Sequence, residues 1–427
     1  MEAAYTETHW RPDLRAPLHI VVLAGSLAFP EGQAATSRAR LLSLALVERG
    51  HQVTVLATRV SEDPSSPRNV EERGEWRGVR FLYSTGTTMR DPRFAVRRWV
   101  ELRGSIKAMT WLVVRKLRSE VDCVVLLNEK RWTVWGAVMR LFLRVARIPW
   151  VLELCELPWT QRADRRFVEK HTSPLDGAAG AVCISVFLEQ WAREWAEAHE
   201  KSVELRRVPI VVDAGEFERI PEARRPDTPQ VLLAAGPGYR DELQLVLRAM
   251  EVVWQRRPDC RLMITGWSVG GPGTGPAFSL VRGASRPHGV VLAGYVPRAR
   301  LLSMYAECSA LLAPLVPGDS SCARFPTKIA EYLVSGRPVV ITSIGEPARL
   351  LADGQNAFVA PSPDPAAYGD AILEALQDMD RATAVGSNGR RFASDEFDYS
   401  RWGECLEELL TTCSGRVQPN PDAGKAG

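Results

Sequence analysis

Short apolar runs alternate with stretches of helical periodicity along most of the chain. Residues 19–24 and 52–57 are apolar enough for buried strands, and residues 38–49 between them repeat apolar positions at helical spacing. Further strands are predicted at residues 79–83, 122–127, 150–154 and 179–184. Because strands that alternate with helices form parallel sheets covered on both faces, this half of the chain predicts an α/β domain.

The same alternation starts again after residue 229. A strand at 230–235 is followed by a glycine-containing turn and a helix at 241–255. Further strands are predicted at 261–264, 290–293, 310–313, 338–341 and 357–360, and further helices at 297–307, 327–335 and 365–377. The expected fold class is therefore α/β, with two tandem doubly wound, Rossmann-like domains facing a central cleft. Such sheets bind ligands at the carboxyl ends of their strands.

This organisation predicts a first domain over residues 1–210 and a second over residues 211–395. The segment 396–413 contains a last helix at 401–410, after the second domain is complete. Residues 414–427 are expected to form a flexible tail, because they combine proline and glycine with few apolar side chains.

Composition limits the functional classes. The 427 residues are 45% hydrophobic and 25% charged, which excludes a disordered chain and a coiled coil. The most apolar stretch, residues 132–150, is interrupted by three arginines, so no membrane-spanning helix is expected. The first sixteen residues hold no apolar run, so no secretory signal is expected either.

The charge distribution and the cysteine content further limit the possible partners and the cellular compartment. Residues 1–210 hold 32 basic and 25 acidic side chains, a balance of +7, and the remaining 22 and 26 give −4, for a net charge of +3. Two domains with different partners are expected, and the excess is too small for nucleic-acid binding. The eight cysteines form no CxxC pair, which predicts reduced thiols in a cytoplasmic protein without a cysteine metal site.

Residues 324–340, RFPTKIAEYLVSGRPVV, give the strongest local signal. Pro326 suits the first turn of a helix, whose free N–H groups favour an anion, and Lys328 adds a positive charge there. Glu331 follows one turn later, and its carboxylate can accept the two hydroxyl hydrogen bonds of a ribose diol. The pattern indicates a nucleotide site; the alternative is a capped surface helix with an exposed Lys–Glu pair.

Two glycine-containing loops follow predicted strands. In LAAGPGYRD, residues 233–241, Gly236 and its neighbour allow close backbone approach, and Arg240 can clamp a diphosphate. Asp241 stands where a dinucleotide fingerprint needs its third glycine, and a plain turn is the alternative. In PEGQAATSR, residues 30–38, Gly32 can let the backbone meet a phosphate; the alternative is an ordinary loop capped by a threonine or serine.

Residues 151–159, VLELCELPW, run from a strand into a loop and place Glu156 at the carboxyl end of the strand. Functional side chains gather at such ends, although a loop carboxylate is more often only solvated. Glu153, inside the strand, is expected to be structural.

Two further segments, 90–118 and 130–147, are basic and rich in aromatic residues. The first holds nine Lys and Arg against two acids, and its apolar side chains recur at helical spacing: Trp99, Leu102, Ile106, Met109, Val113 and Leu117. Basic amphipathic helices can lie on anionic lipid. The alternative, which the sequence favours slightly, is that the apolar stripe is core and the charges are solvated.

Together these segments resemble the GT-B glycosyltransferases of family four, which are retaining and use nucleotide sugars. The resemblance extends over about residues 18–412. The stretches that carry it are GQAATSRARLLSLALVERGHQVTVLA, VPIVVDAGEF, GPGYRDELQLVLRA, HGVVLAGYVPRARLLSMYAECSALLAPL and FPTKIAEYLVSGRPVV.

The resemblance implies a nucleotide sugar on the second domain and an acceptor on the first. By position, Glu331 matches the second acid of the family's Glu-x7-Glu motif and would bind the ribose, and Tyr295 and Val296 match the stretch that cradles the base. Glu156 matches an acceptor-side polar position and is the catalytic candidate. Contacts to the phosphates are implied for Gly32, Gly236, Arg240, Pro326, Thr327 and Lys328. Residues 401–410 resemble a helix that crosses back to the first domain.

Two departures from the family pattern concern the donor. The first acid of the motif falls on Ala323, and the arginine after the glycine turn falls on Pro237. Asp319, Ser320 or Ser321 can substitute from the same loop. These departures favour one alternative, a non-catalytic sugar-nucleotide-binding protein or partner subunit. Another GT-B enzyme, such as an epimerase or a phosphorylase, is a second alternative, and Asp241 argues against a nicotinamide dehydrogenase.

The expected function is therefore glycosyl transfer from a nucleotide sugar to a lipid-linked glycan or small-molecule acceptor, with retention of configuration. The resemblance implies front-face attack, in which the leaving phosphate takes the acceptor proton, and no metal or other cofactor. The protein is expected in the cytoplasm, with peripheral contact to the inner face of an anionic membrane left open, and without a nucleic-acid partner.

Overall fold

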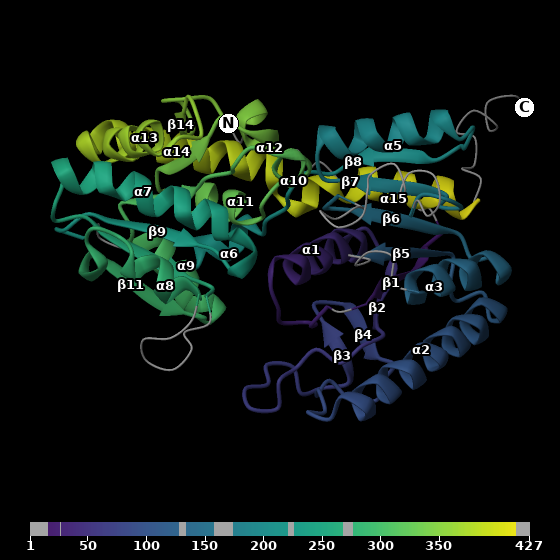
Figure 1. The fold of residues 1–427 in the computed structure, drawn as a ribbon. Helices are drawn as coiled ribbons and strands as arrows, with labels where there is room; N and C mark the ends of the chain where they lie inside the picture. Colours follow the sequence, from purple (N-terminus) through teal and green to yellow (C-terminus); the bar gives the residue numbers. More distant parts are fainter. Residues whose placement is uncertain are drawn as a thin grey trace, which may run out of the picture.

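The computed structural model describes residues 16–25, 27–127, 134–157, 174–220, 226–267 and 276–415, which form two α/β halves (Figure 1). Each half is built on its own sheet, one of eight strands and one of six. Helices cover both faces of each sheet. This arrangement confirms the predicted fold class of two doubly wound domains in tandem.

The first sheet has the strand order β3-β4-β2-β1-β5-β6-β7-β8. Its strands are β1 (His19–Ala24), β2 (Gln52–Ala57), β3 (Arg73–Trp76), β4 (Val79–Tyr83), β5 (Cys123–Leu127), β6 (Trp150–Leu154), β7 (Gly180–Cys183) and β8 (Glu204–Arg207). All neighbours are parallel except β3, which pairs antiparallel to β4. In the centre, Val21 of β1 lies in register with Thr54 and Val124, so the most apolar strands form the middle of the sheet.

The helices of the first domain include α1 (Ala34–Glu48), α2 (Phe94–Leu117), α3 (Val134–Val145) and α5 (Val186–Ala198). The edge strands β3 and β8 were not predicted. Their sequences, RGEW and ELRR, have no apolar run, because an edge strand buries little of its surface.

The second sheet is entirely parallel in the order β11-β10-β9-β12-β13-β14. Its strands are β9 (Gln230–Ala234), β10 (Arg261–Thr265), β11 (Val290–Gly294), β12 (Ala310–Ala313), β13 (Val339–Thr342) and β14 (Phe358–Ala360). The helices of this half are α6 (Ala214–Glu218), α7 (Arg240–Arg256), α8 (Pro276–Arg282), α9 (Arg298–Glu307), α10 (Asp319–Ala323), α11 (Lys328–Val334), α12 (Gly345–Leu350) and α13 (Pro365–Gln377). Short 3-10 turns lie at η1 (Pro237–Tyr239) and η2 (Pro287–Gly289).

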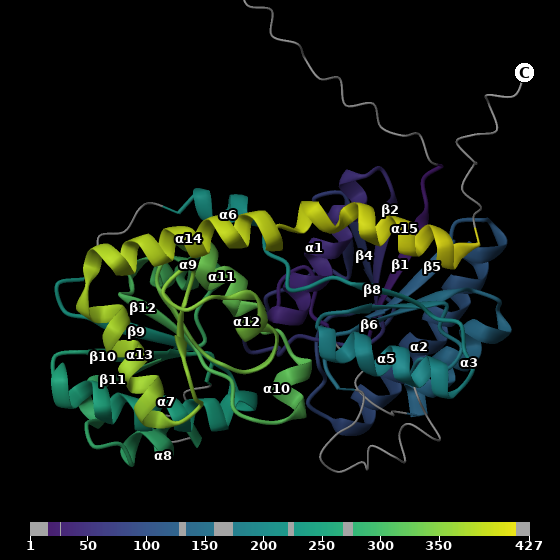
Figure 2. The same ribbon diagram turned by 90° about the horizontal axis from the view of Figure 1, so that it is seen from above.

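The C-terminal segment spans both halves (Figure 2). Helix α14 (Met379–Phe397) packs against α11 of the second domain, and after the turn η3 (Tyr399–Trp402), helix α15 (Gly403–Ser414) packs against α1 and β8 of the first. Leu409 and Leu410 of α15 are buried in the core of the first domain. The predicted tail falls almost wholly on residues 416–427, which lie outside the described residues.

Candidate active site

Among the described residues, the carboxyl-end loops of the two sheets face each other and are joined by several hydrogen bonds. The Ser185 hydroxyl, at the start of α5, donates to the carbonyl of Ala323 at 2.8 Å, and the N–H of Val186 donates to the Glu346 carboxylate at 3.1 Å. At the other edge, Arg68 of the first domain donates to the Tyr295 hydroxyl at 2.6 Å. The loops between these contacts therefore lie where ligands of doubly wound sheets bind.

Between the domains, a small cavity is lined by one face of α1, the linker before α6, and the start of α9 and α11. The residues around it are Ser37, Arg40, Leu41, Val211, Val212, Asp213, Glu216, Arg298 and Glu331. Glu331, the predicted ribose ligand, therefore reaches the interdomain surface.

Arg298 holds Glu331 in place. One guanidinium nitrogen lies 2.5 Å from a Glu331 oxygen, and the other two donors reach Glu216 at 2.9 and 3.2 Å. The hydroxyl of Tyr305 lies 3.4 Å from the second Glu331 oxygen. Burial opposes the charged guanidinium, but Glu331 and Glu216 outweigh it and raise the pKa of Arg298. Glu331 is thus a buried, oriented carboxylate, and the alternative of an exposed Lys–Glu pair is wrong.

Lys328 lies at the loop that follows β9. Its ammonium donates to the carbonyl of Ala234 at 3.0 Å and lies 4.4 Å from the ring centroid of Tyr239. Burial lowers the pKa of Lys328 to about 8; Glu242 raises it and Arg324 lowers it further. A cation that is poorly satisfied by its own fold is suited to a phosphate ligand.

Arg324 is a second cation at the same loop. Its guanidinium lies 5.2 Å from the Tyr239 ring centroid and 3.4 Å from a carboxylate oxygen of Glu242, which is buried in the first turn of α7. Arg324 and Lys328 therefore flank one aromatic ring at the carboxyl end of β9. Arg324 was not predicted as a site residue, although its position four residues before Lys328 was a usable signal.

The glycine turn holds its backbone close to the neighbouring loop. A Cβ on Gly236 would lie 3.7 Å from the carbonyl of Gly266, which follows β10 and has a φ of +89°. Arg240, the predicted diphosphate clamp, is the first residue of α7 and is exposed. Arg240 directly follows Tyr239, the ring that Arg324 and Lys328 flank. Its contact with a diphosphate stays a prediction.

Pro326 and Thr327 precede the helix that carries Glu331. Helix α11 begins at Lys328 with Thr327 as its N-cap, so placing Pro326 in the first helical turn is wrong. Pro326 is buried, and its carbonyl accepts from the N–H of Ile329 at 2.9 Å. These two residues fix the entry of the helix, and their contact with phosphate remains a prediction.

The Gly32 loop leads into α1. A Cβ at Gly32 would lie 2.0 Å from the Thr36 hydroxyl, so only glycine fits. Thr36 donates to the carbonyl of Ala28 at 2.7 Å and lies inside α1, whose N-cap is Gln33. The alternative of a threonine or serine cap is therefore wrong, while the contact of Gly32 with a phosphate remains a prediction.

Glu156 lies just beyond β6 and is exposed. It is near enough to the second domain to act on Tyr239: burial raises the pKa of that phenol, Arg324 lowers it, and the charges of Glu242 and Glu156 raise it further. The Glu156 carboxylate therefore lies within electrostatic range of Tyr239, the ring that Arg324 and Lys328 flank. Glu153 is structural as expected, because it is buried and pairs with Arg38 of α1 at 2.5 Å.

Tyr295 and Val296 follow β11 and are the predicted base-binding stretch. The Tyr295 side chain is 57% exposed, and Val296 packs against the core at its edge. Ala323, in place of the first motif acid, is fully buried. Of its possible substitutes, Asp319 and Ser320 are exposed at the start of α10, and Ser321 is buried.

Comparison with known proteins agrees with this geometry. Residues 229–378, which contain Lys328 and Glu331, match the family model described as glycosyl transferases group 1. A curated relative, the GDP-mannose-dependent alpha-(1-6)-phosphatidylinositol monomannoside mannosyltransferase of Mycolicibacterium smegmatis, is 26% identical over 239 residues. The match covers 53% of this chain and 62% of the relative, so it spans less than two thirds of that protein.

Solved structures resemble the chain over nearly its whole length. Sucrose-phosphate synthase from Thermosynechococcus elongatus has a TM-score of 0.65 at 17% identity and covers 91% of this chain and 97% of its own. HepE from Anabaena, in complex with UDP and glucose, has a TM-score of 0.62 at 14% identity, with 92% and 99% covered. A trehalose-6-phosphate protein from E. coli, bound with UDP-2-fluoro glucose, has a TM-score of 0.63 at 11% identity, with 94% and 100% covered.

The chain has the GT-B fold of these structures, and its residues 229–378 match the group 1 glycosyltransferase family. Two residues close to Glu331 could not be predicted from the sequence. Arg298, which donates to Glu331, comes from α9, and Glu216, which also accepts from Arg298, comes from α6; no spacing in the chain connects them. Within the described residues, no group of three or more His, Cys, Asp or Glu side chains is arranged to hold a metal ion.

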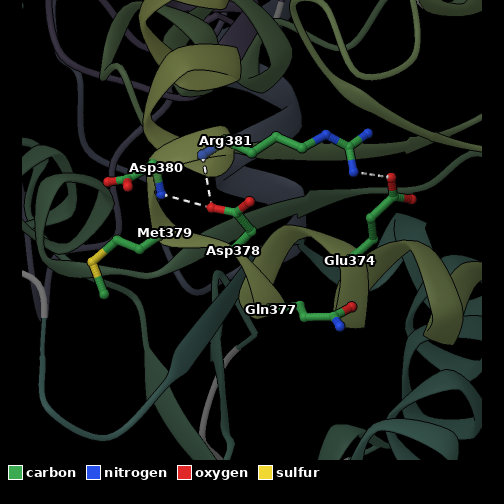
Figure 3. A pocket seen from close by; sticks show the side chains of 6 residues that line it. All are labelled: Glu374, Gln377, Asp378, Met379, Asp380 and Arg381. Atoms are coloured by element: carbon green, nitrogen blue, oxygen red, sulfur yellow. Dashed lines mark hydrogen bonds and ion pairs between the residues drawn. The ribbon is translucent and has the colours of Figure 1, made fainter.

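Another hollow of the GT-B protein lies between α13 and α14 (Figure 3). Its charged side chains are engaged locally: Asp378 accepts from the N–H groups of Asp380 and Arg381 at 3.0 Å, and Arg381 pairs with Glu374 at 2.6 Å. Helix α13 starts at the carboxyl end of β14 and runs back along the sheet. Its last turn therefore lies near the amino ends of the strands, away from the ligand-binding loops. This hollow is therefore not part of the candidate active site.

Proposed function

We propose that this protein is a retaining glycosyltransferase that moves a sugar from a nucleoside diphosphate sugar on the second domain to an acceptor on the first. The observation that carries the proposal is the convergence of Arg324, Lys328 and Glu331 on the loops at the carboxyl ends of the second sheet. All three lie within the residues that match the glycosyltransferase family model.

Each of these groups has a part in the chemistry. Glu331 binds the ribose hydroxyls, and Arg298 keeps its carboxylate aligned. Arg324 and Lys328 stabilise the negative charge that develops on the diphosphate as the glycosidic bond breaks. The acceptor attacks from the same face, through an oxocarbenium-like state, and the leaving phosphate accepts its proton. The positive charges of Arg324 and Lys328 beside the diphosphate support transfer without a metal ion.

Glu156 stands on the acceptor side of this arrangement. Its exposed carboxylate acts on the electrostatics of Tyr239 across the interdomain surface. We propose that it orients the acceptor hydroxyl toward the donor, where alignment of the two substrates contributes much of the rate.

The exposed face of α2 supports a lipid-linked acceptor presented at a membrane. Trp99 is 64% exposed and Leu117 is 81% exposed, while the opposite face, with Ala108 and Leu112, is buried against the domain. On α3, Val145 is 76% exposed. Arginine and lysine side chains flank these apolar groups, which is the composition of a helix that lies on anionic lipid.

The name of the curated relative points in the same direction, since it describes a mannosyltransferase that uses GDP-mannose and acts on a phosphatidylinositol monomannoside. A GDP-linked hexose and a membrane-borne glycolipid are therefore the donor and acceptor that we propose first. The protein would work at the inner face of a membrane. Among the described residues, no helix is long and apolar enough to cross one.

A thermal-shift panel of nucleoside diphosphates and their sugars tests the proposal. Ligand binding raises the melting temperature by mass action. We expect a shift for one nucleotide that disappears in Glu331→Ala and persists in Glu374→Ala, a matched control on α13. A sugar-nucleotide hydrolysis assay follows with the ligand that binds.

A non-catalytic role is the second candidate, because Ala323 replaces a motif acid and its carbonyl is engaged by Ser185. Binding of a nucleotide sugar without transfer or hydrolysis would favour that role. The absence of a shift for every nucleotide would contradict both.

A further inference from the structure

A loop of the first domain between β2 and β3 is held rigidly by a buried carboxylate. Glu62 is 2% exposed and accepts hydrogen bonds from the Ser61 hydroxyl at 2.9 Å, the Arg68 N–H at 2.9 Å and the Asn69 amide at 2.7 Å. Burial opposes ionisation, but these hydrogen bonds outweigh it and hold the pKa of Glu62 below its usual value. The backbone of Glu62 also pairs with Thr88. These hydrogen bonds constrain the turn from 62 to 69.

The same loop holds the backbone of the Gly32 loop. Asn69, which is buried, accepts from the N–H of Glu31 and donates to its carbonyl, both at 2.8 Å. The turn is thus fixed directly beside the loop that is predicted to face the phosphates. A side chain on this turn therefore starts from a backbone that is tied to the Gly32 loop.

Arg68 projects from this turn across to the second domain. Its guanidinium donates one hydrogen bond to the Tyr295 hydroxyl at 2.6 Å, and its central carbon lies 5.0 Å from the Tyr295 ring centroid. No carboxylate within the described residues forms an ion pair with it, so its other N–H donors are directed at no acidic partner there. Tyr295 therefore orients a guanidinium whose donors remain available at the predicted base site.

We propose that Arg68 is a specificity-determining residue that selects the nucleobase of the donor, and that the base it selects is guanine. This rests on the proposed function, because it assigns a residue of the first domain to the nucleotide site of the second. A guanidinium fork matches two neighbouring acceptors, as guanine presents at O6 and N7. Adenine places a donor amino group where the second acceptor is needed, and uracil offers a single carbonyl on that edge.

The neighbouring contacts give the proposal its physical basis. Tyr295 contributes a ring on which a base can stack, and Arg68 covers that ring from the other domain. The hydrogen bond from Arg68 to the Tyr295 hydroxyl sets the direction of the fork. Removing that hydroxyl in Tyr295→Phe keeps the stacking surface and loses only the orientation.

Calorimetric titration of GDP, ADP and UDP into the full-length protein tests the proposal. We expect the unchanged protein to prefer GDP, and Arg68→Ala to lose about tenfold or more of its GDP affinity while ADP and UDP change by less than about twofold. Tyr295→Phe is expected to lose part of the preference, and Arg68→Lys most of it, because an ammonium cannot make the paired contact. Arg73→Ala, an exposed arginine on β3, is the control.

A guanosine diphosphate that lacks N7, 7-deaza-GDP, gives an independent readout on the unchanged protein. We expect it to bind as weakly as GDP binds to Arg68→Ala. An equal loss for all three diphosphates in Arg68→Ala would show a contact that only closes the domains, and a preference for ADP or UDP would show another base; either result overturns the proposal. If the unchanged protein bound no diphosphate, the proposed function itself would fail.

Discussion

Lys328 is a half-buried cation that contacts the Ala234 carbonyl and the Tyr239 ring. Because burial lowers its pKa to about 8, the ammonium is largely charged at pH 7 and largely neutral at pH 9. If this charge binds the diphosphate, affinity should be constant below pH 8 and fall above it, by about tenfold for each further unit. Titration of GDP and UDP between pH 6.5 and 9.5 measures this.

Lys328→Arg is the matched variant, because a guanidinium stays charged over that range. Its affinity profile should be flat between pH 7 and 9, and an unchanged fall in this variant would contradict the role of Lys328. Stability responds in the opposite direction. Between pH 8 and about 10.4 the unfolded chain binds more protons at this lysine than the folded chain, so the free energy of unfolding rises with pH there.

The sequence identified Lys328 and Glu331 because both lie on one short segment whose spacing has a chemical meaning. It did not reveal Arg298 and Arg68, which act on residues brought near by the fold, whereas Arg324 lies on the same segment as Lys328 and could have been predicted. Arg298 donates to one carboxylate from α6 and to another from α11, and Arg68 donates to a tyrosine of the other domain. Pattern analysis detects a ligand-binding segment but not the side chains that orient it.

At the level of elements, apolar runs predicted most buried strands to within a residue or two. Helix α14 was not predicted, because its sequence is polar and contains two glycines. The structure gives the reason for them: a Cβ on Gly386 would lie 2.3 Å from the carbonyl of Gly336, and one on Gly389 would lie 2.7 Å from that of Asn356. Helix α14 can pack this closely only with glycine at these two positions, and glycine weakens the helical pattern of the sequence.

The apolar stripe predicted on α2 is only partly core, because Leu102 and Met109 are half-buried while its other four side chains are exposed. Trp99, Ile106, Val113 and Leu117 recur at seven and four residues on one face, and all four are exposed. The buried face contains Ala108 and Leu112 together with small and polar side chains. A helix that turns its bulky apolar side chains to solvent, between basic ones, has an unsatisfied hydrophobic surface.

We therefore expect Trp99→Glu and Leu117→Glu to reduce co-flotation with vesicles that contain anionic lipid. The apolar side chains lose their insertion energy, and the added charge is repelled by the lipid surface. Thr110→Glu, on the same exposed face without a bulky side chain, separates repulsion from insertion. Binding that is absent in the unchanged protein, or equal in all variants, would contradict the membrane role; nucleotide binding should be equal throughout.

Over the whole molecule, the C-terminal segment connects the two domains a second time, beside the linker before α6. Helix α14 belongs to the second domain, yet Tyr399, Leu406, Leu409 and Leu410 lie in the core of the first. The last strand of each domain is complete before this segment begins. The stability of the first domain therefore depends on residues some two hundred positions away in the chain.

This dependence predicts the effect of one substitution. Leu409 is fully buried, so Leu409→Ala should lower the free energy of unfolding of the first domain by about 2 to 5 kcal/mol. Urea denaturation followed by tryptophan fluorescence reports mainly on that domain, which holds most of the tryptophans. Leu312→Ala, equally buried on β12, is the control and should destabilise the second domain instead. If Leu409→Ala left the tryptophan transition unchanged while Leu312→Ala shifted it, α15 would not be an integral part of the first domain.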